Sequence, residues 1–84
     1  MNPIEPSPAR ESAPDADARF AEFDVVALLE PWPTVGLDAG MWGTVLNVLG
    51  GGQYEVEFTD REGTPVMMLR VPEERLELVW ADPG

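Results

Sequence analysis

The segment Gln53–Thr59 constrains the fold more than any other part of this 84-residue chain. Its sequence, Q-Y-E-V-E-F-T, alternates polar and apolar residues, which is typical of a strand with one buried face and one solvated face. Tyr54, Val56 and Phe58 are expected to face a core, whereas Glu55 and Glu57 are expected to face solvent. Because one strand cannot bury its apolar face alone, the sequence requires neighbouring strands.

Turn signals on both sides of this strand predict two hairpins. Three glycines, at positions 50 to 52, separate it from an apolar run at residues 41–49, and glycine readily adopts the positive φ angles of a tight turn. The sequence D-R-E-G at residues 60–63 then leads into a further strand at residues 64–71. Gly43 within the earlier strand indicates a bulge or a close backbone approach.

The charge of Arg70 sets the expected register of the second hairpin. A loop of even length, two or four residues, places Met67, Leu69 and Val71 on the buried face and Arg70 beside the glutamates. An odd loop would bury Arg70, and burying an unpaired charge costs far more than a hairpin register gains. With a two-residue loop, Glu55 lies opposite Arg70, in a cross-strand pair that contributes about 0.2–1 kcal/mol.

The remaining elements complete an all-β fold. Residues 24–30, D-V-V-A-L-L-E, form a short apolar run before two prolines and predict the first strand. Residues 72–75, P-E-E-R, are typical of a single 3₁₀ turn, after which Leu76–Trp80 is the last strand. This order predicts a small five-stranded SH3-like barrel, whereas an OB-like barrel would need a longer helix.

Composition divides the chain into three parts. Residues 1–19 hold four prolines and no aromatic residue, so they are expected to form a disordered Pro/Ala-rich tail. Residues 20–80 are expected to form the barrel domain, and residues 81–84 a frayed C-terminus. No run of 18 or more apolar residues is present, and the first ten residues lack the features of a secretory signal. A cytoplasmic protein without membrane attachment is expected.

The charged residues limit both chemistry and partners. Five arginines and no lysine oppose sixteen carboxylates, for a formal charge of −11, and the chain contains no histidine or cysteine. The usual nucleophile–base pairs and zinc sites need those residues, so we expect no enzyme activity, no cofactor and no metal. The excess of carboxylates disfavours binding to nucleic acid or to an anionic membrane, and it favours a protein partner with a basic surface.

Two candidate sites for partner binding consist of a loop residue and of charged residues on a hairpin. Trp32, between two prolines in the first long loop, is either an exposed aromatic anchor or a ring folded over one end of the barrel. Glu55 and Glu57, together with Asp60 and Glu62, form an acidic stripe along one hairpin. This stripe is either a docking face for a basic partner or an ordinary solvated strand face.

A third candidate is an apolar strip on the outer face of the strand at residues 64–71. In the expected register, Val66 and Met68 point away from the core. Such a strip either pairs with another chain or is covered by the tail or the last strand of this chain. Trp42 and Trp80, by contrast, are expected to pack against the domain, with the indole N–H groups at the barrel edge.

Four stretches of the sequence resemble a known family. They are D-V-V-A-L at 24–28, G-L-D-A-G-M-W-G-T-V at 36–45, Y-E-V-E-F at 54–58 and V-P-E-E-R-L at 71–76. Together they resemble the bacterial family called domain of unknown function 4926, over nearly all of residues 23–79. The resemblance implies an SH3-like β-barrel with no established activity. Residues 40–58 are also distantly similar to the KOW motif, in the G-x-V core at 43–45, but they lack the basic residues that contact RNA.

Three functions remain open at this point. The favoured one is a non-enzymatic acidic module that binds another protein, such as the product of a neighbouring gene in an immunity-like or antitoxin-like role. The alternative is a KOW-like accessory protein of the ribosome or of RNA, which the G-T-V-L-N-V sequence at 43–48 motivates. The third is a structural module that oligomerises through its edge strands.

Overall fold

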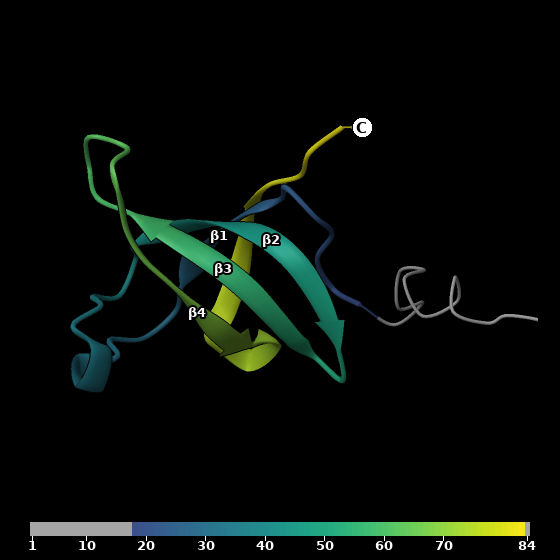
Figure 1. Ribbon diagram of the computed structural model, residues 1–84, viewed down its shortest axis with the longest axis horizontal. Coiled ribbons are helices and arrows are strands. Elements are labelled where there is room, and N and C mark those ends of the chain that lie inside the picture. Colours follow the sequence, from purple (N-terminus) through teal and green to yellow (C-terminus); the bar gives the residue numbers. More distant parts are fainter. Residues whose placement is uncertain (1–17, 84) are drawn as a thin grey trace, which may run out of the picture.

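The computed structural model describes residues 18–83, which form an all-β domain (Figure 1). The tail predicted at residues 1–19 lies, up to residue 17, outside the described residues. Five antiparallel strands form one sheet in the order β4-β3-β2-β1-β5. The strands are β1 (Val25–Leu28), β2 (Trp42–Gly50), β3 (Gln53–Thr59), β4 (Pro65–Pro72) and β5 (Leu76–Trp80). Two single 3₁₀ turns, η1 (Pro33–Val35) and η2 (Glu73–Arg75), interrupt the connections.

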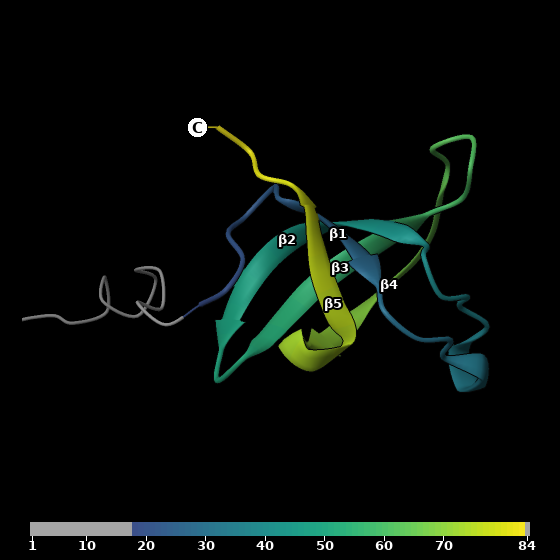
Figure 2. The ribbon, with the colours of Figure 1, turned by 180° about the vertical axis from the view of Figure 1, so that it is seen from behind.

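The sheet is bent around its core but is not closed into a barrel. β4 and β5 lie at the two ends of the strand order, and η2 joins them. Figure 2 shows β5 beside β1, with which it pairs antiparallel. The predicted all-β fold, with five strands and a 3₁₀ turn before the last strand, is confirmed, and the predicted SH3-like barrel takes the form of a bent sheet that does not close.

Glycines shape the β2–β3 hairpin in two ways. Gly51 and Gly52 adopt φ angles of 63° and 77°, which side-chain-bearing residues rarely accept, and they form the tight turn. Gly43 faces the core opposite Phe58, and a Cβ atom at this position would lie 2.5 Å from Cγ1 of Val56. The predicted close backbone approach at Gly43 is therefore confirmed.

The β3–β4 hairpin has the predicted register but not the predicted loop. Glu55 lies opposite Arg70, and Val56 lies opposite Leu69. The loop spans residues 60–64, an odd number, and a register shift of one residue between Phe58 and Thr59 compensates for it. The shift keeps Arg70 out of the core, as the cost of burying its charge requires, so the predicted register is confirmed and the predicted even loop length is wrong.

The core lies on the inner face of the sheet. Its buried residues come from all five strands, from the loop after η1 and from the segment before β1; they are Phe20, Val26, Leu28, Leu37, Val45, Tyr54, Val56, Phe58, Val71 and Leu76. The hydroxyl oxygen of Tyr54 accepts hydrogen bonds from the backbone N–H groups of Arg19 (2.9 Å) and Phe20 (3.3 Å). The Phe20 ring also packs edge-on against Tyr54, with the centroids 5.2 Å apart. Tyr54 thus anchors the segment before β1.

Asp24 joins the two ends of the described chain. Its buried carboxylate accepts a hydrogen bond from Ala21 N–H at Oδ2 (2.9 Å) and another from Asp82 N–H at Oδ1 (3.0 Å). Because Asp82 follows β5 directly, these bonds fix the end of β5 beside the start of β1. This arrangement positions the outer surface of β5 and β1, which forms the candidate site.

Candidate functional site

Two tryptophans flank β1 on the outer face of the sheet. Val25 and Ala27 alternate with core residues along β1, so their side chains point outward. Across the ladders, Val25 lies opposite Trp80 of β5, while Ala27 lies opposite Glu77 of β5 and Trp42 of β2. Residues that are opposite each other share one face of a sheet. We call these five residues the outer patch.

Both indoles of the outer patch are largely exposed. Trp42 is 55% exposed and Trp80 is 51% exposed, whereas Ala27 between the strands is only 4% exposed. The expectation that both tryptophans pack against the domain was wrong. Neither tryptophan belongs to the core cluster or to the side chains packed against it. Because burying a large aromatic side chain is normally favourable, this degree of exposure on the two strands that flank β1 is unusual for a packing role.

The outward position of each tryptophan has a local cause in its own strand. In β2, Gly43 occupies the inward position opposite Phe58, so the period of two turns Trp42 outward. In β5, Leu76 faces the core, and a regular strand would also turn Trp80 inward. A register shift between β1 and β5 pairs Trp80 with Val25 and moves it to the outer face. Such a bulge leaves no clear signal in the sequence L-E-L-V-W.

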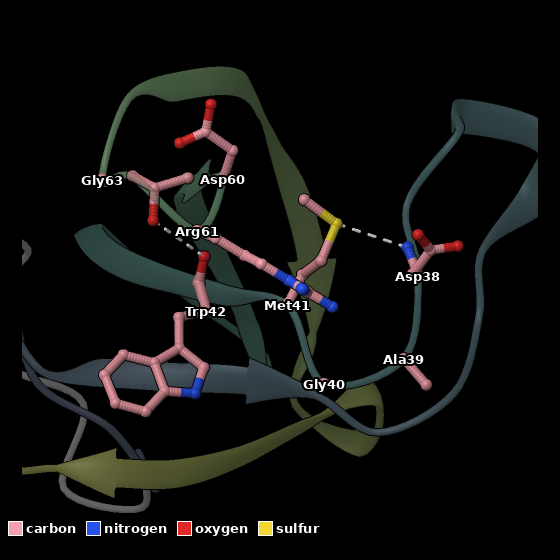
Figure 3. A pocket seen from close by; sticks show the side chains of 9 residues that line it. Asp38, Ala39, Gly40, Met41, Trp42, Asp60, Arg61 and Gly63 are labelled. Carbon is pink, nitrogen blue, oxygen red and sulfur yellow. Dashed lines mark hydrogen bonds between the residues drawn. The ribbon is translucent and has the colours of Figure 1, made fainter.

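A pocket of about 640 Å³ adjoins the outer patch at Trp42. It lies between the segment at residues 38–41 and the β3–β4 loop, and its lining residues are Asp38, Ala39, Gly40, Met41, Trp42, Thr59, Asp60, Arg61 and Gly63. Figure 3 shows the Arg61 side chain extending from the loop toward the segment that carries Asp38 and Met41. The hydroxyl of Thr59 donates to the carbonyl oxygen of Trp42 (3.5 Å), which links the loop side of the pocket to β2.

The outer face continues from the patch to β4. Thr44 of β2 lies between Val25 and Glu57, and Glu57 lies opposite Met68 of β4. Met68 is 53% exposed, and Val66, on the same strand, is 49% exposed. The predicted apolar strip therefore lies on the same outer face as the two tryptophans, and the half-buried residue Glu57 lies between the strip and the patch.

Trp32, the aromatic candidate from the sequence, occupies a different environment. It is half-buried and packs against the core cluster. The guanidinium carbon of Arg75 lies 4.3 Å from the centroid of its ring. Two backbone hydrogen bonds with Leu37 (2.8 and 3.1 Å) hold Trp32 in the loop around η1. The structure thus places this ring between the core and Arg75.

Two carboxylates of the acidic stripe, those of Glu55 and Asp60, form hydrogen bonds within the domain. Glu55 lies opposite Arg70, and Oε1 of Glu55 accepts a hydrogen bond from the Asn47 side-chain amide. Oδ1 of Asp60 accepts the backbone N–H groups of Glu62 and Thr64, both at 2.9 Å, and so shapes the β3–β4 loop. Two of the predicted site residues, Glu57 and Met68, lie in one cross-strand row that continues through Thr44 to Val25 and Trp80. The sequence did not identify Val25 or Trp80 as site residues.

Within residues 18–83, no group of three or more histidine, cysteine, aspartate or glutamate side chains is arranged to hold a metal ion. In the same part of the chain, no helix has the length and apolar character needed to cross a bilayer.

Comparison with known proteins gives one match. A sequence model of the family described as Domain of unknown function (DUF4926) matches residues 22–78, which include β1 to β4 and the first part of β5. No curated protein and no solved structure matches. The match covers more than half of the chain and ends within β5. The chain therefore belongs to the DUF4926 family.

Proposed function

We propose that this domain is a non-enzymatic protein–protein interaction module that binds its partner on the outer patch. The observation that carries this proposal is the exposure of Trp42 and Trp80 on either side of β1. Tryptophan is the residue type most enriched among side chains that dominate binding energy, because one ring buries a large area. Two such rings on one sheet face form a natural centre for an interface.

The backbone around the outer patch supports this role. Trp42 and Trp80 belong to strands whose backbones are held on one or both sides by sheet hydrogen bonds. Binding through rigid elements loses less conformational entropy than binding through a loop that must first become ordered. The polar residues Glu77, Thr44 and Glu57 border the rings. An apolar centre with a polar border is the usual composition of a protein interface.

Charge supports a basic partner. Residues 18–83 contain twelve carboxylates and four arginines, for a formal charge of −8. A partner of opposite charge would be attracted over roughly the Debye length, about 8–10 Å at physiological salt. The product of a neighbouring gene, in an immunity-like or antitoxin-like pair, is the partner that we favour.

Photocross-linking from within the outer face tests the proposal. Thr44 lies between Val25 and Glu57 on this face and is replaced with p-benzoylphenylalanine in the full chain, expressed in its native cell. The proposal expects one protein to be cross-linked and identified by mass spectrometry. The same replacement at Glu74, which is exposed on η2, is the control and should not capture that protein.

Affinity for the purified partner then locates the interface. The variants Trp42→Thr and Trp80→Thr keep a residue with good strand propensity, and each should weaken binding by at least about tenfold, as expected for a dominant interface residue. Leu49→Thr is the matched control, because Leu49 is also an exposed apolar residue of β2 but lies seven residues from Trp42, about 23 Å along the strand. Equal affinity of all three variants and the wild type, or cross-linking to RNA instead of protein, would contradict the proposal.

A further inference from the structure

The outer patch places an aromatic ring and a carboxylate on opposite sides of the same residue. Glu77 and Trp42 both lie opposite Ala27, one on each neighbouring strand. With adjacent strands about 4.8 Å apart, their backbones are separated by about 10 Å. A cation above Ala27 would therefore have an indole on one side and a negative charge on the other. Ala27 itself is only 4% exposed, so the side chains around it cover it, and the cation would lie over these side chains.

The same chain already stacks arginine on aromatic rings elsewhere. Arg75 lies over Trp32, with its guanidinium carbon 4.3 Å from the ring centroid, and Arg19 lies over Phe20 at 5.2 Å. Among residues 18–83, these are the two arginine–aromatic contacts. Neither involves the outer patch, so the indoles of Trp42 and Trp80 are available to a cation from another molecule. A planar guanidinium stacks on an indole better than an ammonium group does.

We propose that the partner presents an arginine-containing basic segment to the outer patch, with guanidinium groups stacked on Trp42 and Trp80 and one of them paired with Glu77. This inference rests on the proposed function and specifies the chemistry of its partner. The negative charge of the domain attracts such a segment, and the two rings distinguish arginine from other sources of positive charge.

The spacing of the two rings also specifies the segment. Trp80 and Trp42 lie at diagonally opposite corners of the outer patch, two strands and about two residues apart. With the usual strand dimensions, their backbones are about 12 Å apart. An extended segment covers this distance in three or four residues, so two arginines at that spacing reach both rings.

Arg61, in the adjoining pocket, provides a second way to test the proposed attraction of a cation to Trp42. It lines the pocket together with Trp42, and it carries the charge that the partner is expected to bring (Figure 3). Its guanidinium repels an incoming cation at this position. Replacing Arg61 with glutamine removes the repulsion, so this variant is expected to bind a basic segment more tightly than the wild type does.

Titration of the full chain with an arginine octapeptide tests the inference. Binding is measured by calorimetry at about 150 mM NaCl, where the Debye length of about 8 Å suppresses diffuse attraction. We expect saturable binding that is weaker by about threefold or more with a lysine octapeptide, because lysine stacks less well on indole. Glu77→Gln should weaken arginine octapeptide binding by about threefold to fivefold, and Arg61→Gln should strengthen it.

The control is Glu74→Gln, which removes the same charge from η2, three residues away from Glu77 in the sequence. Equal loss of affinity in Glu74→Gln and Glu77→Gln would overturn the inference, because it would show attraction to net charge alone. Absence of saturable binding would overturn it as well. The proposed function is tested separately by cross-linking. A cross-linked partner that needs Trp42 and Trp80 but contacts them without arginine would support the interaction module and contradict the arginine-containing segment.

Discussion

Trp42 lies directly opposite Ala27 across the β1–β2 ladder, and it remains 55% exposed while Ala27 is almost completely buried. The ring therefore covers part of β1 and presents its remaining surface to solvent. Shielding an alanine does not require the largest side chain available, since a valine or threonine also shields a neighbouring strand. The proposed interaction module accounts for this excess apolar surface, because a partner would cover it.

The first prediction separates the contribution of the outer tryptophans to stability from that of the core. Trp42→Thr and Trp80→Thr should each lower the free energy of unfolding by about 1–2 kcal/mol, because roughly half of each ring is already exposed. Phe58→Ala should cost about 3–5 kcal/mol, because Phe58 is fully buried. Urea denaturation measures all three. A loss in Trp42→Thr as large as that in Phe58→Ala would assign this ring to the core.

The second prediction concerns the close approach at Gly43. A Cβ atom there would lie 2.5 Å from Cγ1 of Val56 and 3.0 Å from Cδ1 of Phe58, both in the core. Gly43→Ala should therefore destabilise the domain by about 1–3 kcal/mol, the usual cost of overpacking. Gly51→Asn is the control, because Gly51 has open space around it and asparagine tolerates its positive φ. Thermal unfolding of Gly43→Ala at the wild-type temperature would refute the contact.

The third prediction concerns the anchor formed by Tyr54. Tyr54→Phe removes the oxygen that accepts the N–H groups of Arg19 and Phe20. Leaving a buried donor without a partner costs about 1–3 kcal/mol, so unfolding should require less urea by that amount. Hydrogen exchange should accelerate at the Phe20 amide, whereas amides within β3 slow enough to exchange by global unfolding should change by the loss of global stability alone. An unchanged exchange rate at Phe20 would show that the anchor has another origin.

The fourth prediction concerns the net charge of the domain. With a formal charge of −8 on residues 18–83, repulsion between carboxylates should lower stability when the ionic strength is low. Added sodium chloride should therefore raise Tm, and each 1 kcal/mol regained corresponds to about 4–8 °C in a domain of this size. Differential scanning calorimetry at several salt concentrations measures the effect. A Tm that did not depend on salt would mean that local contacts, such as those of Glu55 with Asn47 and opposite Arg70, already neutralise the carboxylates.

Patterns within a few residues predicted the strands well. The bounds expected for Gln53–Thr59 and Leu76–Trp80 coincide with β3 and β5, because each run is delimited by glycine, proline or charged turn residues. The pairing of Glu55 with Arg70 also followed from the sequence, because the cost of burying Arg70 leaves one acceptable register. The family resemblance over residues 23–79 agrees with the match over residues 22–78.

Features that depend on several strands were not predictable in the same way. Whether the two edge strands of a sheet pair with each other depends on the accumulated twist and coiling of all the strands. The sequence therefore predicted an SH3-like barrel but could not show that β4 and β5 remain unpaired. The outward position of Trp80 depends on one register shift between β1 and β5. A shift of a single residue reverses the face of a side chain, and nothing in L-E-L-V-W marks it. The main components of the candidate site, Trp42 and Trp80, were therefore assigned to packing.

The indole N–H signals of the three tryptophans test the central claim most directly. Each tryptophan gives one indole signal in a ¹⁵N-correlated NMR spectrum of the labelled full chain, and the arginine octapeptide is added in steps. The account predicts that the signals of Trp42 and Trp80 shift progressively and saturate together, whereas the signal of Trp32, which is already stacked with Arg75, stays in place. A shift of Trp32 with Trp42 and Trp80 unmoved would contradict the account and transfer the binding site to the loop around η1.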